Sequence, residues 1–254
     1  MLEIYSFASN RPDLIRPQFE SFEKHLKEPF VFRVVNNGFW NDREAWYRID
    51  LGCHNLGLEA IDVPKDLTHA THLGNIFNQG TGMYTSVGAS CGYSVDITWS
   101  EIISHRDGKV LVCHHDMFLV EDCVLSNFIA DKPLAFIPQD RPPHIDLAKG
   151  ESECYLWEGF VLADIPKLPM PSSICWWGGE VNGAITDVGG RSYWWFKEHK
   201  VPYFRIVPLH VSENDVDYEY LLFNGRPLVF HYRKAAYDKT ENLAAKNELL
   251  LKKL

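Results

Sequence analysis

Two histidines and an aspartate stand together in the middle of the chain, between two apolar runs. The run 110–113 is short, rich in β-branched residues and continuous, which is typical of a buried parallel strand. His114, His115 and Asp116 follow directly, at the end of a strand where open α/β sheets place their ligands. On extended backbone His114 and Asp116 point to the same side. This pair predicts a divalent-metal site, and such a metal can hold a diphosphate.

The composition sets the size and the class of partner. The chain has 254 residues, 46% of them hydrophobic, which suffices for the core of one large domain or two small ones. A formal charge of −9 makes it a poor general nucleic-acid binder, so we expect no nucleic-acid partner. One anionic small molecule can still bind through a metal, local cations and backbone N–H groups.

Cysteine spacing and hydropathy indicate the compartment. The six cysteines are scattered and form no C-x-x-C pair, which favours free thiols in a reducing compartment over a structural zinc site. No run approaches the roughly 18–20 apolar residues of a membrane span, so we expect no transmembrane segment. Residues 1–4 lead directly into a predicted strand without a basic and apolar leader. We therefore expect a cytoplasmic protein.

Strand and helix patterns alternate along the first half of the chain, which predicts an α/β fold with a parallel sheet. The second half has proline-rich turns and an aromatic cluster at 175–179, with no clear domain boundary. The predicted strands are 2–7, 30–35, 58–63, 109–113, 134–138, 204–210 and 228–232, and the predicted helices are 14–27, 97–104, 123–130, 187–199 and 240–254, the last amphipathic.

Six ordered segments together resemble the GT-A glycosyltransferases, which use nucleotide sugars. The most similar members are small phage, viral and bacterial enzymes that begin with a strand and an Asn-Arg-Pro turn. The matching segments are Ser6–Pro12, Val34–Asn37, His114–Phe118, Tyr155–Gly159, Asp187–Gly190 and Phe230–Arg233.

The resemblance implies one GT-A-like catalytic domain over 1–254, with a mostly parallel, Rossmann-like sheet flanked by helices. Within it, about 1–130 would form the nucleotide-sugar half, about 131–238 the acceptor side, and 239–254 a C-terminal helix. The implied activity moves a hexose from a nucleotide diphosphate sugar to a glycan or another hydroxyl acceptor.

In that family an Asp-x-Asp motif holds the metal that bridges the donor diphosphate. The resemblance makes Asp116 the second acid, while His114 stands in place of the first. A nitrogen ligand suits Mn²⁺ better than Mg²⁺. His231, at the end of a late strand, matches the third ligand, and Arg233 and Lys234 match the cations on the diphosphate. The alternative for the first pair is that the histidines at 114 and 115 are ordinary strand-end residues and Asp116 caps the next turn. For His231 the alternative is a satisfied histidine beside exposed cations in a loop.

The resemblance also implies residues that contact the donor nucleotide. The stretch from Ala8 through Asn10 to Arg11, together with Asn36, would contact the base and ribose. Asn10 could equally cap a helix, and Asn36 could serve turn chemistry alone. A further pair, His69 and His72, would reach the nucleotide or diphosphate or else be structural.

Carboxylates in the second half are candidates for the acceptor side. Asp187 is the first candidate for the base that deprotonates the acceptor hydroxyl if the enzyme inverts, and Glu158 and Glu180 are its rivals. The alternative for Asp187 is a helix N-cap. Trp157, and with it the tryptophans at 176 and 177, would line the sugar pocket or belong to the core.

Two other classes of function stay open. A metal-dependent hydrolase of phosphoesters could use the histidines and Asp116, although no H-E-x-x-H cluster is present. A degenerate GT-A fold that only binds carbohydrate would account for the missing first acid.

Overall fold

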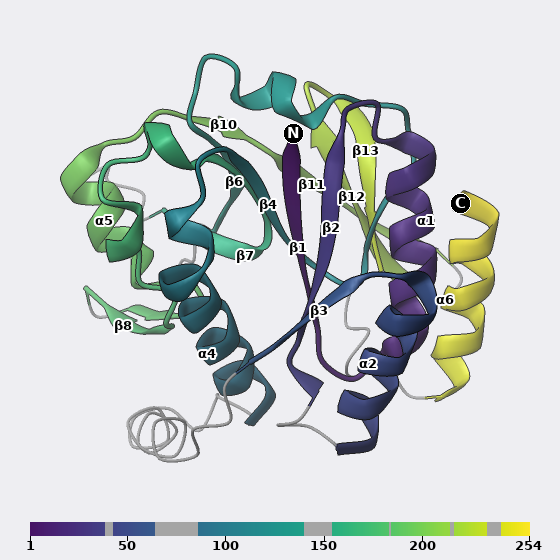
Figure 1. Ribbon diagram of the computed structural model, residues 1–254. Helices are drawn as coiled ribbons and strands as arrows, with labels where there is room; N and C mark the ends of the chain where they lie inside the picture. The colour runs from purple at the N-terminus through teal and green to yellow at the C-terminus, as the bar shows by residue number, and fades with distance from the viewer. Residues whose placement is uncertain (39–42, 64–85, 140–153, 183, 214–215, 233–239) are drawn as a thin grey trace.

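The computed structural model describes residues 1–38, 43–63, 86–139, 154–182, 184–213, 216–232 and 240–254. They form a seven-stranded central sheet, a four-stranded sheet and a two-stranded sheet, with helices on both faces of the central sheet (Figure 1). The predicted α/β class with a mostly parallel central sheet flanked by helices is therefore confirmed.

The central sheet has the strand order β10-β6-β7-β4-β1-β2-β3. Only β7 runs antiparallel to its neighbours, β4 and β6, and the other pairs are parallel. The middle strands are buried on both faces, which explains their continuous apolar sequences. The strands are β1 (Leu2–Ala8), β2 (Phe30–Asn36), β3 (Glu59–Asp62), β4 (Lys109–His114), β6 (Leu134–Gln139), β7 (Tyr155–Asp164) and β10 (Tyr203–Arg205).

Alternating side chains of β1 build a core on each face of the central sheet. Ile4 belongs to the cluster that includes Phe22 of helix α1, and Tyr5 belongs to the cluster that includes Trp99 of helix α4. These clusters fix α1 and α2 on one face, and α4 and α5 on the other. The helices are α1 (Ile15–His25), α2 (Arg43–Leu56), α4 (Ser86–Glu101), α5 (Ser192–His199) and α6 (Thr240–Lys253).

A second, antiparallel sheet has the order β11-β12-β13-β5. Its strands are β5 (Met117–Leu119), β11 (Val207–Glu213), β12 (Val216–Phe223) and β13 (Arg226–His231). Strand β5 follows β4 after a two-residue turn, so the chain passes from one sheet to the other at 115–116. The β12–β13 hairpin turns through Asn224 and Gly225, both at positive φ, as a tight hairpin requires. A small separate hairpin pairs β8 (Gly179–Val181) with β9 (Ala184–Thr186).

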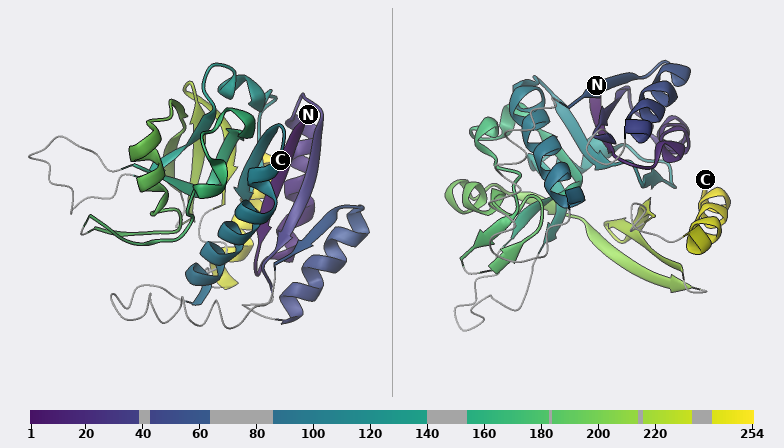
Figure 2. Two further views of the ribbon diagram at one scale, coloured as in Figure 1. Left: turned by 60° about the vertical axis from the view of Figure 1, so that its left-hand side comes forward. Right: turned by 90° about the horizontal axis from the view of Figure 1, so that it is seen from below.

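The predicted C-terminal helix is present as α6 and packs beside β12 and β13. Tyr232 donates a hydrogen bond of 2.9 Å from its hydroxyl to Asn247, and Leu250 is buried. In the right-hand view of Figure 2 the second sheet extends from the central sheet toward this helix. None of the helices in the described part of the chain is both long and apolar enough to span a bilayer.

Several predicted boundaries were wrong. The helix predicted to begin at Asp187 begins at Ser192, because Gly189 lies at φ +86° and residues 187–191 form successive turns. The predicted strand 204–210 is divided between β10 and β11, and the predicted helix 123–130 is a 3₁₀ segment, Leu125–Ile129. The helix predicted over 97–104 is the end of α4, which stops at Glu101.

Candidate active site

The carboxyl ends of β1, β2 and β4 meet at one edge of the central sheet. Phe7 lies opposite His114, and Ala8 lies opposite Asn36. In Figure 1 β1 runs downward from the amino terminus, so this edge is the lower one. The strand ends that were predicted to carry the site are therefore neighbours in space.

His114 and Asp116 do not share the extended backbone that their spacing suggested. Strand β4 ends at His114, and residues 115–116 form a turn before β5. Alternation along β4 sends His114 to the α4 face, together with Val112. Asp116 lies after the turn and faces the second sheet. The expectation that both side chains point to one side by strand alternation was therefore wrong.

Asp116 and His231 are brought together by pairing between the two ends of the second sheet. Strand β13 pairs with β5, with His231 opposite Met117, and the backbone N–H of Tyr232 donates to the Asp116 carbonyl at 2.9 Å. Nε2 of His231 lies 3.8 Å from Oδ2 of Asp116, and both side chains are buried. Two of the three predicted metal ligands thus lie side by side.

His231 is oriented by a carboxylate on the neighbouring strand. Glu219 of β12 lies directly opposite His231, and its Oε2 is 2.9 Å from His231 Nδ1. An ionised carboxylate only accepts, so Nδ1 of His231 donates to Glu219, and Nε2 is directed toward Asp116. His210 of β11 lies opposite Glu219, and its Nδ1 is 2.7 Å from the other carboxylate oxygen of Glu219.

The Asp116 carboxylate is suited to a cation. Its Oδ1 is buried and has no hydrogen-bond partner among the described residues. Burial alone would raise the pKa of Asp116, but His231 and the histidines at 114 and 115 lower it, so the group is ionised at neutral pH. A buried, ionised oxygen without a partner is unfavourable unless a cation or a ligand supplies one.

An irregularity in β7 presents two functional side chains on opposite faces. The β6–β7 register shifts between Phe136 and Pro138, and bulges of this kind re-aim side chains. Trp157 packs against the α1-side core, whereas Glu158 lies near Cys91 of α4. A Cβ at position 159 would lie 2.2 Å from the indole of Trp157, so only glycine allows this arrangement.

The indole of Trp157 lies between the two candidate histidines. Its ring centroid is 5.5 Å from that of His114, edge to face, and 5.8 Å from that of His231. Nε2 of His114 faces Glu158 Oε1 at 3.4 Å instead of the Asp116–His231 pair. Burial opposes a charge on His114, but the neighbouring Cys91 thiol and Glu158 carboxylate raise its pKa well above the usual value.

A pocket of about 440 Å³ opens beside this cluster, within the size range of small-molecule sites. It contains an indole face, two carboxylates, imidazoles and a guanidinium, which are the groups that recognise a polar, hydroxyl-rich ligand. The lining residues are Ile137, Pro138, Gln139, Trp157, Asp187, Arg205, Ile206, Val207, Pro208, His210, Glu219 and His231.

Asp187 reaches this pocket from a glycine-dependent turn. Its Oδ1 accepts a 2.9 Å hydrogen bond from the Val188 N–H, and its own N–H donates to the Tyr155 hydroxyl at 3.2 Å. At Gly189 a Cβ would lie 1.7 Å from the Leu156 carbonyl oxygen. The N-cap interpretation of Asp187 is wrong, because the N-cap position of α5 is occupied by Arg191.

Residues predicted to bind the nucleotide surround the ends of β1 and β2. Asn36 accepts from the Gly38 N–H at 3.1 Å and donates to the Trp46 carbonyl at 3.0 Å, so its amide does perform turn chemistry. Asn10 is not the N-cap residue of the first helical turn, which is Arg11. Nucleotide contact by Asn36 and Asn10 stays a prediction, as does a backbone role for the buried Ala8.

Arg11 joins the first loop to the C-terminal helix. Its guanidinium forms two hydrogen bonds with Asp13, at 2.8 and 2.6 Å, and lies over the ring of Tyr232. It also approaches the Asn247 side chain at 3.4 Å. This largely buried side chain therefore has a structural role, because it links the first loop to the C-terminal helix. Nucleotide contact by Arg11 stays a prediction.

Other predicted residues fall elsewhere. His69, His72, Arg233 and Lys234 lie outside the described residues. His115 is structural: its backbone N–H and its Nδ1 both bond to the Phe7 carbonyl, and burial lowers its pKa.

Sequence reasoning missed four residues of the site, which are Glu219, His210, Cys91 and Arg205. The Asn-Gly dipeptide at 224–225 predicts a two-residue hairpin, and counting outward from it brings Glu219 close to His231. A one-residue bulge near Leu221 completes the pairing, and the bulge itself carries no sequence signal that we can identify. His210 follows only once Glu219 is placed. The remaining two, Cys91 and Arg205, have no local pattern that marks them.

Comparisons with known proteins give limited similarity. No protein-family profile and no curated protein matches this chain. The chain is similar to the solved galactosyltransferase LgtC, in a complex with donor and acceptor sugar analogues and in an active-site mutant. Both are 16% identical over 66% of this chain, with TM-scores of 0.39, and the match spans 59% and 58% of their length. At this level neither family membership nor activity transfers to this chain.

Proposed function

We propose that this protein is a glycosyltransferase that moves a hexose from a nucleotide diphosphate sugar to a glycan or another hydroxyl acceptor. The observation that carries the proposal is the pairing of Asp116 with His231 at the carboxyl edge of the sheet, beside a polar pocket. Diphosphate-binding sites of α/β folds occur at this edge. The resemblance of six ordered sequence segments to GT-A enzymes supports the same activity.

The residues present fit a divalent cation. Asp116 offers a buried carboxylate oxygen that has no hydrogen-bond partner in the described part of the chain, and His231 offers Nε2, with Glu219 behind its Nδ1. This carboxylate–histidine arrangement is typical of metal-ligating imidazoles. One nitrogen and one oxygen ligand favour Mn²⁺ over Mg²⁺. When bound, the ion would neutralise charge on the diphosphate of the donor.

The pocket beside the pair suits the acceptor or the transferred sugar. Trp157 offers an aromatic face on which a sugar ring can pack, while Arg205 and His210 offer donors to hydroxyl groups. Arg205 also adds positive charge to the lining of this pocket. Ile137 and the ring of Trp157 form an apolar part of the pocket lining.

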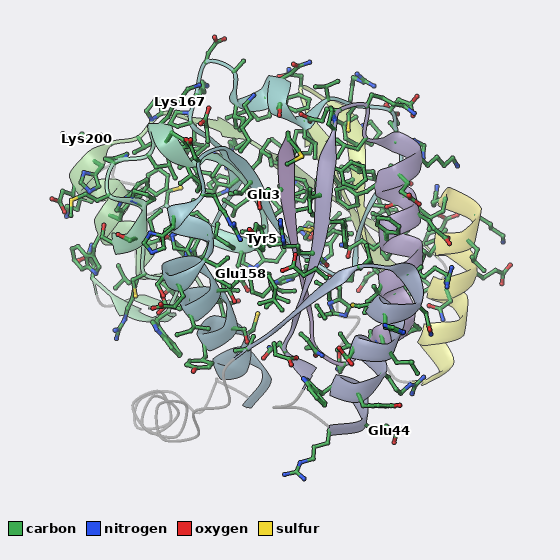
Figure 3. All side chains as sticks on the ribbon, viewed as in Figure 1. Glu3, Tyr5, Glu44, Glu158, Lys167 and Lys200 are labelled. Carbon is green, nitrogen blue, oxygen red and sulfur yellow. The ribbon has the colours of Figure 1, made fainter. Side chains whose placement is uncertain are left out.

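Of the two predicted catalytic carboxylates, Asp187 is better placed. A general base must come within hydrogen-bond reach of the hydroxyl that it deprotonates. Asp187 lines the pocket, whereas Glu158 is 3% exposed and does not. In Figure 3 Glu158 is labelled near the middle of the view, beside α4. We therefore assign deprotonation or orientation of the acceptor hydroxyl to Asp187.

A thermal-shift panel tests the proposal. UDP-, GDP-, CMP- and dTDP-linked sugars are added with and without Mn²⁺ to the wild type and to Asp116→Asn, and product is then sought with the donor that binds. A ligand that binds the native state raises its melting temperature. We expect one nucleotide class to raise it, with Mn²⁺ required and the shift lost in Asp116→Asn. No shift with any sugar nucleotide, or turnover of simple phosphoesters instead, would overturn the proposal.

A further inference from the structure

Three potential metal ligands converge on the α4 face of the central sheet, outside the Asp116–His231 pair. Cys91 comes from α4, His114 from the end of β4 and Glu158 from the irregular part of β7. Their ligand atoms all lie within 4.8 Å of one another. Strand alternation and the β7 register shift place them there, so the cluster follows from the fold of the sheet.

The cluster contains buried polar atoms that the described protein does not satisfy. Glu158 is 3% exposed and its Oε2 has no hydrogen-bond partner in the described ranges, although Oε1 faces the Cys91 thiol at 3.8 Å. Nε2 of His114 likewise has no hydrogen bond within these ranges; the 3.4 Å separation from Glu158 is an ion-pair distance. Leaving such atoms unsatisfied in the interior is costly.

Two of the three separations match those of a tetrahedral metal site, and the third is within 4.8 Å. With bonds of about 2.3 Å to sulfur and about 2.1 Å to nitrogen or oxygen, tetrahedral geometry predicts about 3.4 Å between N and O and about 3.6 Å between S and O. The observed distances are 3.4 Å from His114 Nε2 to Glu158 Oε1 and 3.8 Å from Cys91 Sγ to the same oxygen. Little movement is needed to receive an ion.

We infer that Cys91, His114 and Glu158 form a second divalent-cation site, of the sulfur, nitrogen and oxygen type that selects Zn²⁺. A thiolate ligand disfavours Mg²⁺ and Mn²⁺, which prefer hard oxygen donors, and favours Zn²⁺. The indole of Trp157 contacts His114 of this site and also His231 of the Asp116–His231 pair. Bound Zn²⁺ joins α4 to β4 and β7 beside the pocket. The inference does not depend on the proposed glycosyl transfer.

Cobalt substitution tests the site directly. The full chain is treated with a chelator, and Co²⁺ is titrated into it while the near-ultraviolet and visible spectra are recorded. We expect a thiolate-to-cobalt charge-transfer band that saturates at one ion per chain and disappears when Zn²⁺ is added. Cys91→Ser should abolish the band. Cys175→Ser, which changes another partly buried cysteine, should retain it.

Two further variants separate this site from the proposed active site. Asp116→Asn should keep the cobalt–thiolate band, because Asp116 is not a ligand of the second site. Glu158→Gln should weaken Co²⁺ binding while the band itself remains. A band lost in Asp116→Asn but present in Cys91→Ser would overturn the assignment.

A second measurement uses only the wild type. Alkylation with iodoacetamide, followed by peptide mapping, should show that Zn²⁺ protects Cys91 and leaves the reactivity of Cys175 unchanged. No charge-transfer band in the wild type, together with no zinc protection of Cys91, would show that the three residues form only a hydrogen-bonded cluster.

Discussion

Nε2 of His231 lies 3.8 Å from Oδ2 of Asp116, although the two residues belong to opposite halves of the chain. The contact depends on the pairing of β13 with β5 and on the turn that carries the chain from one sheet to the other. Asp116 is thereby placed at the junction of the two sheets, where His231 can share a cation with it.

Replacing Glu219 should lower the affinity for Mn²⁺, although Glu219 itself is not a proposed ligand of the ion. Mutation of an outer residue that orients a ligating histidine typically lowers metal affinity by about 10–100-fold. We expect about a tenfold loss in Glu219→Gln, which keeps a neutral acceptor opposite His231 Nδ1, and about a 100-fold loss in Glu219→Ala. Calorimetric titration of Mn²⁺ measures both. Glu121→Gln, an exposed glutamate paired with Arg226, serves as control. Equal Mn²⁺ affinity in the wild type and the three variants would show that Glu219 does not support the metal site.

Asp187→Asn should separate chemistry from donor binding. If Asp187 deprotonates the acceptor hydroxyl, kcat should fall by about 10²–10⁴, while the donor KM stays unchanged. Steady-state kinetics with varied donor and acceptor gives both values. Glu158→Gln should lower kcat far less, because Glu158 does not line the pocket. The assignment would be reversed if Glu158→Gln were the inactive variant and Asp187→Asn were fully active.

Gly189→Ala should destabilise the protein strongly. The φ of Gly189 is +86°, and an added Cβ would lie 1.7 Å from the Leu156 carbonyl oxygen. Strained backbone and overpacking together should reduce the free energy of unfolding by about 3 kcal/mol or more. Gly57→Ala is the matched control, since φ is +66° there but nothing lies within 4 Å of the new Cβ. We expect it to lose only about 1 kcal/mol. Urea unfolding compares the two, and similar losses would contradict the steric argument.

Asp13 should contribute to stability only above acidic pH. Burial alone would raise the pKa of Asp13, but hydrogen bonding and charge from Arg11 lower it below the usual value of an aspartate. A lowered folded pKa means that the stabilisation is present above the unfolded pKa and is lost as pH falls through the folded one. Because half of the Asp13 side chain is exposed, we expect Asp13→Asn to lose only about 0.5 kcal/mol at pH 7.

Urea unfolding of the wild type and Asp13→Asn at pH 7 and at about pH 3 checks this prediction. The difference in the free energy of unfolding between the two proteins should be smaller at the lower pH. Asp107→Asn, a change at an exposed aspartate, should show no such dependence. A difference that widens toward acid would mean that Asp13 is not stabilised by Arg11.

Much of the fold could be predicted from local patterns, because the middle strands are buried on both faces and have continuous apolar sequences. The strand ends at Phe7, Asn36 and His114 were also placed at one edge correctly, since parallel strands share that edge. Boundaries failed where glycines or turns interrupt a pattern, as at Gly189. The two-residue spacing of His114 and Asp116 wrongly predicted that their side chains point to the same side, because the strand ends at His114.

The candidate site was predictable only in part. His231 and Asp116 could be selected as candidates by residue type and position, but nothing local predicts that they touch. Cys91 and Glu158 meet through an irregular stretch of β7, and Glu219 faces His231 only after a bulge. Such register shifts arise from long-range packing, so sequence periodicity cannot reveal them.

The most direct test of the central claim is Mn²⁺ binding followed by electron paramagnetic resonance, in which the signal of free hexaaqua Mn²⁺ falls as the ion binds. The account predicts one bound Mn²⁺ per wild-type chain, tightened by a nucleoside diphosphate and lost in both Asp116→Asn and His231→Gln. Cys91→Ser should bind Mn²⁺ as the wild type does. Undiminished Mn²⁺ binding in Asp116→Asn and His231→Gln would contradict the assignment of this pair as the metal site.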